Sequence, residues 1–68
     1  MSGHILLNGK DYELNEQVSI LSLLKELGIL HKAMAIAVNT QVVKKCLWES
    51  YILQNGDEVE ILDFVGGG

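Results

Sequence analysis

Apolar and polar residues alternate on both sides of an Asn-Gly pair near the start of the chain, in the stretch ILLNGKDYEL. Alternation with a period of two is typical of strands, and Asn-Gly is preferred in type I′ turns because both turn positions need positive φ. The pattern predicts a hairpin with strands over residues 4–7 and 10–15. A two-residue turn also fixes the facing pairs, which are Leu7 with Lys10, Leu6 with Asp11, Ile5 with Tyr12 and His4 with Glu13.

The two faces of this hairpin differ in character. One face carries the side chains that we expect in the core: Ile5, Leu7, Tyr12 and Leu14. Leu6 points to the opposite face, where its neighbours are polar, because successive side chains of a strand alternate between faces. It is an apolar residue directed away from the core.

The next segment, VSILSLLKELG, changes from the period of a strand to that of a helix. Its apolar residues fall at i, i+3, i+4 and i+7, on one stripe of a helix: Ile20, Leu23, Leu24 and Leu27. Ser19 precedes the stripe as a natural N-cap, and Gly28 follows it as a natural left-handed stop. We therefore expect a helix over residues 20–27.

Four signals predict the remaining elements. AMAIAV is a strand pattern with two faces, one of Met34, Ile36 and Val38 and the other of Ala33, Ala35 and Ala37. The alanine face lets another group approach closely. An Asn-Thr turn leads to a short strand over residues 41–43, and KKCLWESY predicts one helical turn that seats Trp48. In the last strand, EVEILDFV, the inward positions are Val59 and Ile61 and the outward positions are Glu60 and Leu62.

This order of elements is that of an α+β roll, in which one helix packs on a mixed sheet. The first and last strands can then lie side by side in parallel. In that arrangement Leu6, Leu62 and Phe64 form an apolar patch on the outer, helix-free face of the sheet. Exposed apolar clusters mark binding sites for other proteins, so we expect a partner to dock there.

Composition indicates one small domain. The 68 residues, 49% of them hydrophobic and none of them proline, suit a folded chain but leave no room for a deep catalytic cleft. The single cysteine, Cys46, excludes an internal disulfide framework and fits a reducing cytoplasm. We expect it to be a partly buried, unreactive thiol because no histidine accompanies it in a motif. No stretch approaches the roughly 20 apolar residues that span a bilayer, so no membrane association is expected.

The net charge of the chain favours some classes of binding partner over others. A net charge of −4 disfavours nucleic acid, whose binding depends on releasing counterions from phosphates, and favours a protein with a basic docking face. His4 and His31 are too far apart in the pattern for a metal pair. We expect the acidic residues of the last strand to be solvated or to meet basic residues of a partner; they are Asp57, Glu58, Glu60 and Asp63. No metal and no bound cofactor are predicted.

Three glycines at residues 66–68 bury no side chain and cost the most entropy to order. A free α-carboxyl is ionised at neutral pH, so Gly68 is an anion that only an outside, ATP-using enzyme can activate. The four residues from Val65 reach roughly 13 Å at about 3.3 Å each, enough to thread a channel that admits no Cβ atoms. We expect a folded domain over residues 1–65 and a flexible tail over residues 66–68.

The hairpin LLNG, the helix SILSLLKELG, the strand AIAVN, the Trp48 segment followed by NGDEVEIL, and the VGGG ending together resemble the ThiS family of sulfur carrier proteins of thiamine biosynthesis. The resemblance covers residues 5–68 in order without a large gap. It implies a ubiquitin-like β-grasp fold. It also implies that the chain is a protein cosubstrate and not itself an enzyme.

The resemblance further implies a set of partners. In such families an E1-like enzyme uses ATP to adenylate the terminal glycine carboxylate, and sulfur from a cysteine-desulfurase relay replaces AMP. The resulting thiocarboxylate supplies the sulfur that thiazole synthase needs. Carried over by position, Gly68 is the acyl carrier, Gly67 fits the enzyme channel, and Gly66 stands where some relatives carry a larger residue. The expected partner-binding residues are Leu6, Leu62, Phe64 and Val65.

Other functions remain open at this point. The small subunit of molybdopterin synthase is similar in fold and tail, although the shorter chain and the VGGG ending favour thiazole. Two further alternatives are a ubiquitin-like modifier that joins target lysines through isopeptide bonds and an interaction module without tail chemistry. The sequence holds no phosphate loop, no nucleophile paired with a base and no metal motif, so nothing in it favours an enzyme.

Overall fold

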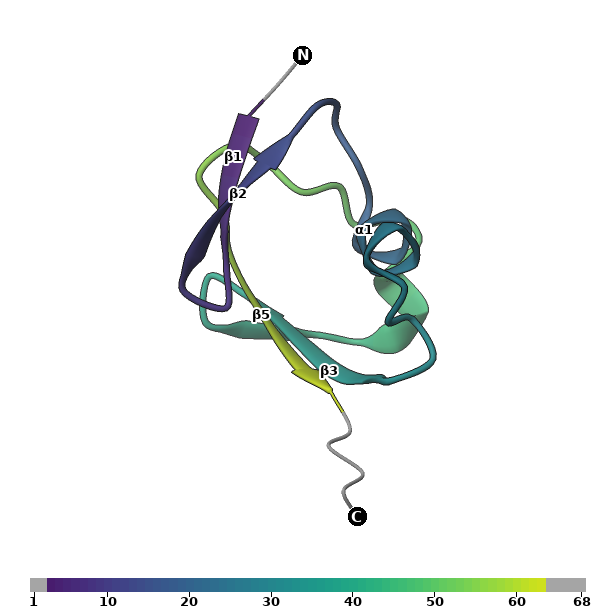
Figure 1. Cartoon of the computed structure of the whole chain (residues 1–68). Helices are drawn as coiled ribbons and strands as arrows, with labels where there is room; N and C mark the ends of the chain where they lie inside the picture. Colours follow the sequence, from purple (N-terminus) through teal and green to yellow (C-terminus); the bar gives the residue numbers. More distant parts are fainter. Residues whose placement is uncertain (1–2, 64–68) are drawn as a thin grey trace.

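The computed structural model describes residues 3–63, which form a five-stranded mixed sheet with one helix packed on one face (Figure 1). The elements in chain order are β1 (Gly3–Leu7), β2 (Lys10–Leu14), α1 (Ile20–Leu27), β3 (Ala33–Val38), β4 (Gln41–Val43), the 3₁₀ helix η1 (Lys45–Leu47) and β5 (Glu58–Asp63). The predicted α+β roll is confirmed.

The last strand of the chain is the central strand of the sheet, whose order is β2-β1-β5-β3-β4. It runs parallel to β1 and antiparallel to β3. The predicted parallel pairing of the first and last strands is therefore correct. Strand β5 thus joins two hairpins, β1–β2 and β3–β4, that do not pair with each other directly.

The first hairpin has the predicted register at all four facing pairs, from Leu7 opposite Lys10 to His4 opposite Glu13. Its turn residues Asn8 and Gly9 have φ values of 51° and 84°, the positive values that a type I′ turn requires. Leu6 is 40% exposed, on the face away from the helix. The alternation of the sequence was enough to place these side chains.

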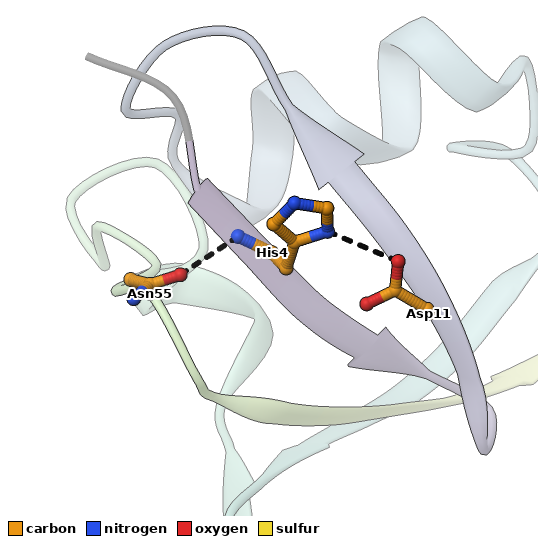
Figure 2. A network of polar contacts seen from close by, with 3 residues as sticks. All are labelled: His4, Asp11 and Asn55. Carbon is orange, nitrogen blue, oxygen red and sulfur yellow. Dashed lines mark hydrogen bonds and ion pairs between the residues drawn. The ribbon is translucent and has the colours of Figure 1, made fainter.

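Strand β1 begins one residue earlier than predicted, because Gly3 pairs with Leu14 on β2, and the loop before β5 also contacts this end of the strand. The backbone N–H of His4 donates to Asn55 Oδ1 at 2.8 Å, and His4 Nδ1 lies 3.0 Å from Asp11 Oδ2 on β2 (Figure 2). A Cβ added at Gly3 would lie 3.0 Å from Asn55 Oδ1, so glycine permits this close approach. Both His4 and Asp11 are exposed, and their ion pair adds little to stability.

Helix α1 has the predicted bounds and caps. Ser19 Oγ accepts a hydrogen bond from the backbone N–H of Ser22 at 3.1 Å. Gly28 adopts the left-handed conformation at φ 74° and donates to the last carbonyls of the helix. The apolar stripe of the helix is buried against the sheet, as the i, i+3, i+4, i+7 spacing predicted.

The core lies between α1 and the concave face of the sheet, and Trp48 closes one side of it. Helix η1 seats this indole, which is 1% exposed and donates from Nε1 to the carbonyl of Val43 at 2.9 Å. The hydrogen bond satisfies the one polar atom of the ring in an apolar site. The other side chains buried to 2% or less are Ile5, Ile20, Leu23, Leu24, Ile36, Val38, Leu53 and Val59.

One prediction about β3 is wrong. Met34 was expected to share a face with Ile36, yet Met34 is 63% exposed and Ile36 is 1% exposed. The pairing with β5 runs from Ala33 opposite Asp63 directly to Ala35 opposite Leu62, so Met34 is one extra residue in β3. Such a β-bulge reverses the alternation, which buries Ala33 and leaves Ala35 and Ala37 as the outward alanines.

Candidate functional site

The glycine tail lies outside the described residues, and so do Phe64 and Val65. The structure therefore tests neither the acyl-carrier role predicted for Gly68 nor the domain boundary at residue 65. It does show the last residue before this segment: Asp63 ends β5 opposite Ala33, at the start of β3. We call this end of the β3–β5 pair the tail root.

Leu6 and Leu62 both face away from the helix, with 40% and 64% of their surfaces exposed. They do not touch each other along the sheet. Leu6 pairs with Glu58, and Leu62 lies four residues further along β5, about 13 Å away at the rise of a strand. The outward side chain of Glu60 lies between them. Within residues 3–63, the predicted patch is thus two separate apolar positions.

Leu62 instead belongs to an apolar groove on β3, β4 and β5. It faces Ala35 across the sheet, while Ala37 faces both Val42 and Glu60. The groove has a volume of about 310 Å³, and we call it the outer groove; it is lined by Asn8, Ala35, Ile36, Ala37, Val42, Glu60, Ile61 and Leu62. Two alanine methyls form its floor between the larger side chains of Leu62 and Val42, both well exposed.

Part of this groove was predicted from the pattern of residues along the chain. The alanine face was expected to let another group approach closely, and Ala35 and Ala37 do lie on the outer surface. Val42 was missed, although it is 73% exposed. The signal for it was the two-residue turn between β3 and β4, which places Val42 opposite Ala37 by the same rule that fixed the register of the first hairpin.

Asn8 holds the strand that carries Leu62. Its Oδ1 atom accepts a hydrogen bond from the backbone N–H of Ile61 at 2.7 Å, and its backbone N–H donates to the carbonyl of Val59 at 2.8 Å. Strand β1 ends at Leu7. The side chain of Asn8, in the turn that follows, therefore extends the hydrogen bonding to β5 by one residue. The position of Leu62 is thus fixed from both neighbouring strands.

The acidic residues of this region have two different roles. Glu58 and Glu60 are exposed, as expected for a solvated acidic strand. Asp57 is half-buried, accepting hydrogen bonds from the backbone N–H of Gln54 at 2.8 Å and from Asn39 Nδ2 at 3.0 Å. These bonds close the turn before β5, so Asp57 stabilises a loop and presents less charge to a partner than the two glutamates.

The prediction for Cys46 is wrong in one respect, because this thiol is exposed and not partly buried. It lies on η1 in a surface hollow of about 690 Å³ that His31, Lys45 and Glu49 also line.

Among residues 3–63, no group of three or more His, Cys, Asp or Glu side chains could hold a metal ion. In the same residues no helix is long and apolar enough to cross a membrane.

Comparison with known proteins gives a consistent result. The model of the ThiS family matches residues 5–68. The sulfur carrier protein ThiS of Escherichia coli is 28% identical over 64 residues, which cover 94% of this chain and 97% of that protein. The crystal structure of the thiamine biosynthesis protein ThiS from Geobacter metallireducens superimposes with a TM-score of 0.79 at 26% identity, over 96% of this chain and 99% of that one.

A third relative is much longer. The thiazole synthase of Paramagnetospirillum magneticum is 30% identical over 64 residues, which are 94% of this chain but only 20% of that protein. The chain therefore spans about a fifth of the length of this relative. The similarity concerns one segment of the synthase and not the whole enzyme.

Proposed function

This chain belongs to the ThiS family of sulfur carriers, with the ubiquitin-like β-grasp fold of that family, and we propose that it carries sulfur as a thiocarboxylate on Gly68. An E1-like enzyme uses ATP to adenylate the Gly68 carboxylate, and a cysteine persulfide supplied by a cysteine-desulfurase relay then displaces AMP. A second thiol cleaves the resulting acyl disulfide, which leaves the thiocarboxylate on Gly68 and a disulfide between the two cysteines. The thiocarboxylate supplies the sulfur for thiazole formation in thiamine biosynthesis. The chain is a protein cosubstrate in these steps, which take place in the cytoplasm.

The observation that carries the proposal is the extent of the family match, which runs through the glycines to residue 68. The physical argument agrees with it. A carboxylate has to be activated before a nucleophile can attack its carbon, which fits activation by a separate, ATP-using enzyme. Gly66 and Gly67 present no Cβ to a narrow enzyme channel. The five residues after Asp63 reach about 16 Å when extended, so the reaction can proceed away from the folded body.

The outer groove is the docking surface that we propose for the adenylating enzyme. Its alanine floor accepts a large apolar side chain, and Leu62 and Val42 form its walls. Exposed apolar surface of this kind on a small domain is typical of a protein interface. Glu58 and Glu60 lie on the same face and suit basic residues of the partner. The groove ends near the tail root, where docking would place the tail at the entrance of the channel.

Thiazole synthase is the acceptor that we propose. The support is the relative whose name is thiazole synthase and one fifth of which matches this chain. A carrier-like segment within a synthase polypeptide favours a physical partnership between carrier and synthase. The molybdopterin-type carrier shares the tail chemistry that we propose, and it differs in the acceptor.

Intact-protein mass spectrometry tests the tail chemistry. The chain is coexpressed with a candidate E1-like enzyme and a cysteine desulfurase, and a Gly68-deleted chain serves as the matched control. We expect the mass gain of one oxygen replaced by sulfur in the full chain and no gain in the deletion. Unchanged mass beside an active adenylating enzyme would contradict the proposal. Conjugates to lysines of other proteins would instead support a modifier.

Transfer to the acceptor is tested separately. The thiocarboxylate form is incubated with a candidate thiazole synthase and with a candidate large subunit of molybdopterin synthase. We expect loss of the sulfur, measured by the same mass difference, only with the thiazole synthase and its small substrates. Loss only with the molybdopterin enzyme would leave the carrier chemistry intact and change the acceptor.

A further inference from the structure

Positive charge gathers at the tail root, in a chain whose net charge is −4. A surface hollow of about 490 Å³ is lined by His31, Lys32, Ala33, Met34 and Lys45. We call it the tail-root hollow. Ala33, which lies in it, pairs with Asp63 at the end of β5. The cations therefore stand beside the point from which the tail leaves the fold.

One side of the hollow is held by backbone hydrogen bonds, and a cation–π contact positions the lysine on the other side. The loop after α1 is fixed because the N–H groups of Lys32 and Ala33 donate to the carbonyl of Ile29 at 2.9 and 3.0 Å. Across from it, Lys45 comes from η1, and its Nζ atom lies 5.8 Å from the centroid of the Trp48 ring. This cation–π contact directs the ammonium group along a buried, immobile indole.

The described side chains, those of residues 3–62, give the lysines of the hollow no salt-bridge partner. The ion pair that meets salt-bridge distance among them is His4 with Asp11, and it involves neither Lys32 nor Lys45. Glu49 lines the adjoining hollow together with His31 and Lys45, but it forms no salt bridge with them. Two lysines are therefore available to an outside anion next to exposed Met34, whose thioether is an apolar contact.

We propose that the tail-root hollow binds an acidic segment of the adenylating enzyme, one that carries carboxylates beside an apolar side chain. The inference rests on the proposed function, since it names a second contact of the same partner. A protein segment fits better than a free phosphate. Phosphate sites converge several backbone N–H donors on one point, whereas this hollow is lined by the side chains of two lysines and a histidine beside those of Ala33 and Met34.

The position of the tail-root hollow indicates how this contact would orient the complex. Glu58 and Glu60 make the outer face of the sheet acidic, whereas the tail-root hollow is cationic. A partner that matches both must carry basic and acidic groups in a fixed order around the channel entrance. Complementary charges of opposite sign set the orientation of a complex and suppress wrong ones. The hollow thereby determines how the carrier is turned when its tail enters the channel.

Charge reversal with a matched control tests this inference. The doubly substituted chain Lys32→Glu with Lys45→Glu is compared with Lys10→Glu with Lys25→Glu, which changes the net charge by the same amount at positions that do not line the hollow. Binding to a candidate adenylating enzyme is titrated without ATP, so that the readout does not depend on sulfur transfer. Thermal melting verifies that each variant is folded.

We expect the hollow variant to bind at least about tenfold more weakly than the wild type at roughly 0.1 M salt, and the control to lose less than about threefold. Equal losses of affinity in both variants would show that the weaker binding follows from net charge alone, and this would overturn the proposal. It would also be overturned if the wild type did not bind, or if inorganic phosphate alone saturated the hollow below about 1 mM in an NMR titration. Thiocarboxylate formation by the wild type, measured by mass, decides the proposed function independently.

Discussion

Asn8 Oδ1 accepts a hydrogen bond of 2.7 Å from the backbone N–H of Ile61, 53 residues away in the chain. The bond joins the turn of the first hairpin to the middle of the last strand. Asn8 therefore serves two purposes at once: its backbone adopts the positive φ that the turn needs, and its side chain takes the place of a strand partner beyond the end of β1.

The two purposes of Asn8 can be separated by substitution. Asn8→Gly keeps the positive φ but leaves the N–H of Ile61 without its protein acceptor, so we expect a loss of about 0.5–1.5 kcal/mol in the free energy of unfolding. Asn8→Asp keeps the acceptor and should lose less than about 0.5 kcal/mol. Urea unfolding measures both. Equal stability of the glycine variant and the wild type would show that the hydrogen bond contributes nothing net.

Thr40 is strained. It has φ 71°, a value that is unusual for a β-branched residue, in the turn between β3 and β4. Thr40→Gly creates the Asn-Gly pair that type I′ turns prefer, so we expect a gain of about 1 kcal/mol, or about 4–8 °C in Tm for a domain of this size. Thr40→Val, which keeps the branched shape, should show no gain. A Tm of the glycine variant at or below that of the wild type would contradict this.

Because of Tyr12, we expect the free energy of unfolding to depend on pH in the alkaline range. Its Oη atom on β2 donates to Glu26 Oε2 on α1 at 2.8 Å. This hydrogen bond, followed by burial and the negative charge of Glu26, raises the pKa of Tyr12 above its ordinary value of about 10. The raised pKa means that folding favours the neutral phenol. Its contribution is fully present below about pH 10 and is lost as pH rises through the folded pKa.

The measurement is the urea midpoint between about pH 8 and pH 11 for the wild type and Tyr12→Phe. The phenylalanine variant lacks the titrating group, so we expect the difference in stability between the two chains to shrink as pH rises past about 10. Other groups also titrate in this range, and the comparison cancels them. Parallel curves for the two chains would mean that the hydrogen bond does not bias the protonation of Tyr12.

Leu62→Glu tests the outer groove. The side chain is 64% exposed, so the substitution should leave Tm nearly unchanged while placing a charge in the groove where we propose that an apolar partner group docks. We expect the apparent affinity for the adenylating enzyme to fall at least about tenfold, which corresponds to roughly 1.4 kcal/mol. Ile52→Glu, at a position 42% exposed that does not line the groove, is the matched control. The same loss in both chains would exclude the groove as the docking site.

The substitution Leu6→Glu tests how far the proposed docking surface extends along the sheet. Leu6 pairs with Glu58 and lies about 13 Å from Leu62, so a second glutamate there adds to existing negative charge. We expect weaker adenylation with an unchanged melting curve, and a smaller effect than that of Leu62→Glu. Activity equal to that of the wild type would remove Leu6 from the docking surface and leave the outer groove.

Local patterns predicted the elements of this fold well. The Asn-Gly pair fixed a hairpin register that the structure reproduces, and Ser19 and Gly28 marked both ends of the helix. These features depend on residues close together in the chain. The bulge at Met34 has no such signal, because AMAIAV alternates without a glycine or any other break. Pairing with a distant strand decides it.

The candidate site was less predictable for the same reason. Alternation correctly placed Leu6 and Leu62 on the outer face, but it does not say how far one strand is shifted along its neighbour. The parallel register of β1 and β5 sets that shift, and it separates the two leucines by the length of four residues. The tail-root hollow was also invisible in the sequence, since Lys32 and Lys45 meet only through tertiary packing.

The central place of β5 has a consequence for synthesis on the ribosome. The hairpins β1–β2 and β3–β4 each pair with β5 and not with the other, so the sheet closes only after residues 58–63 have been made. A nascent chain that stops sooner exposes unpaired edges on β1 and β3, which invite aggregation and degradation. The strand that completes the sheet is thus also the one that leads to the glycines at the end of the chain.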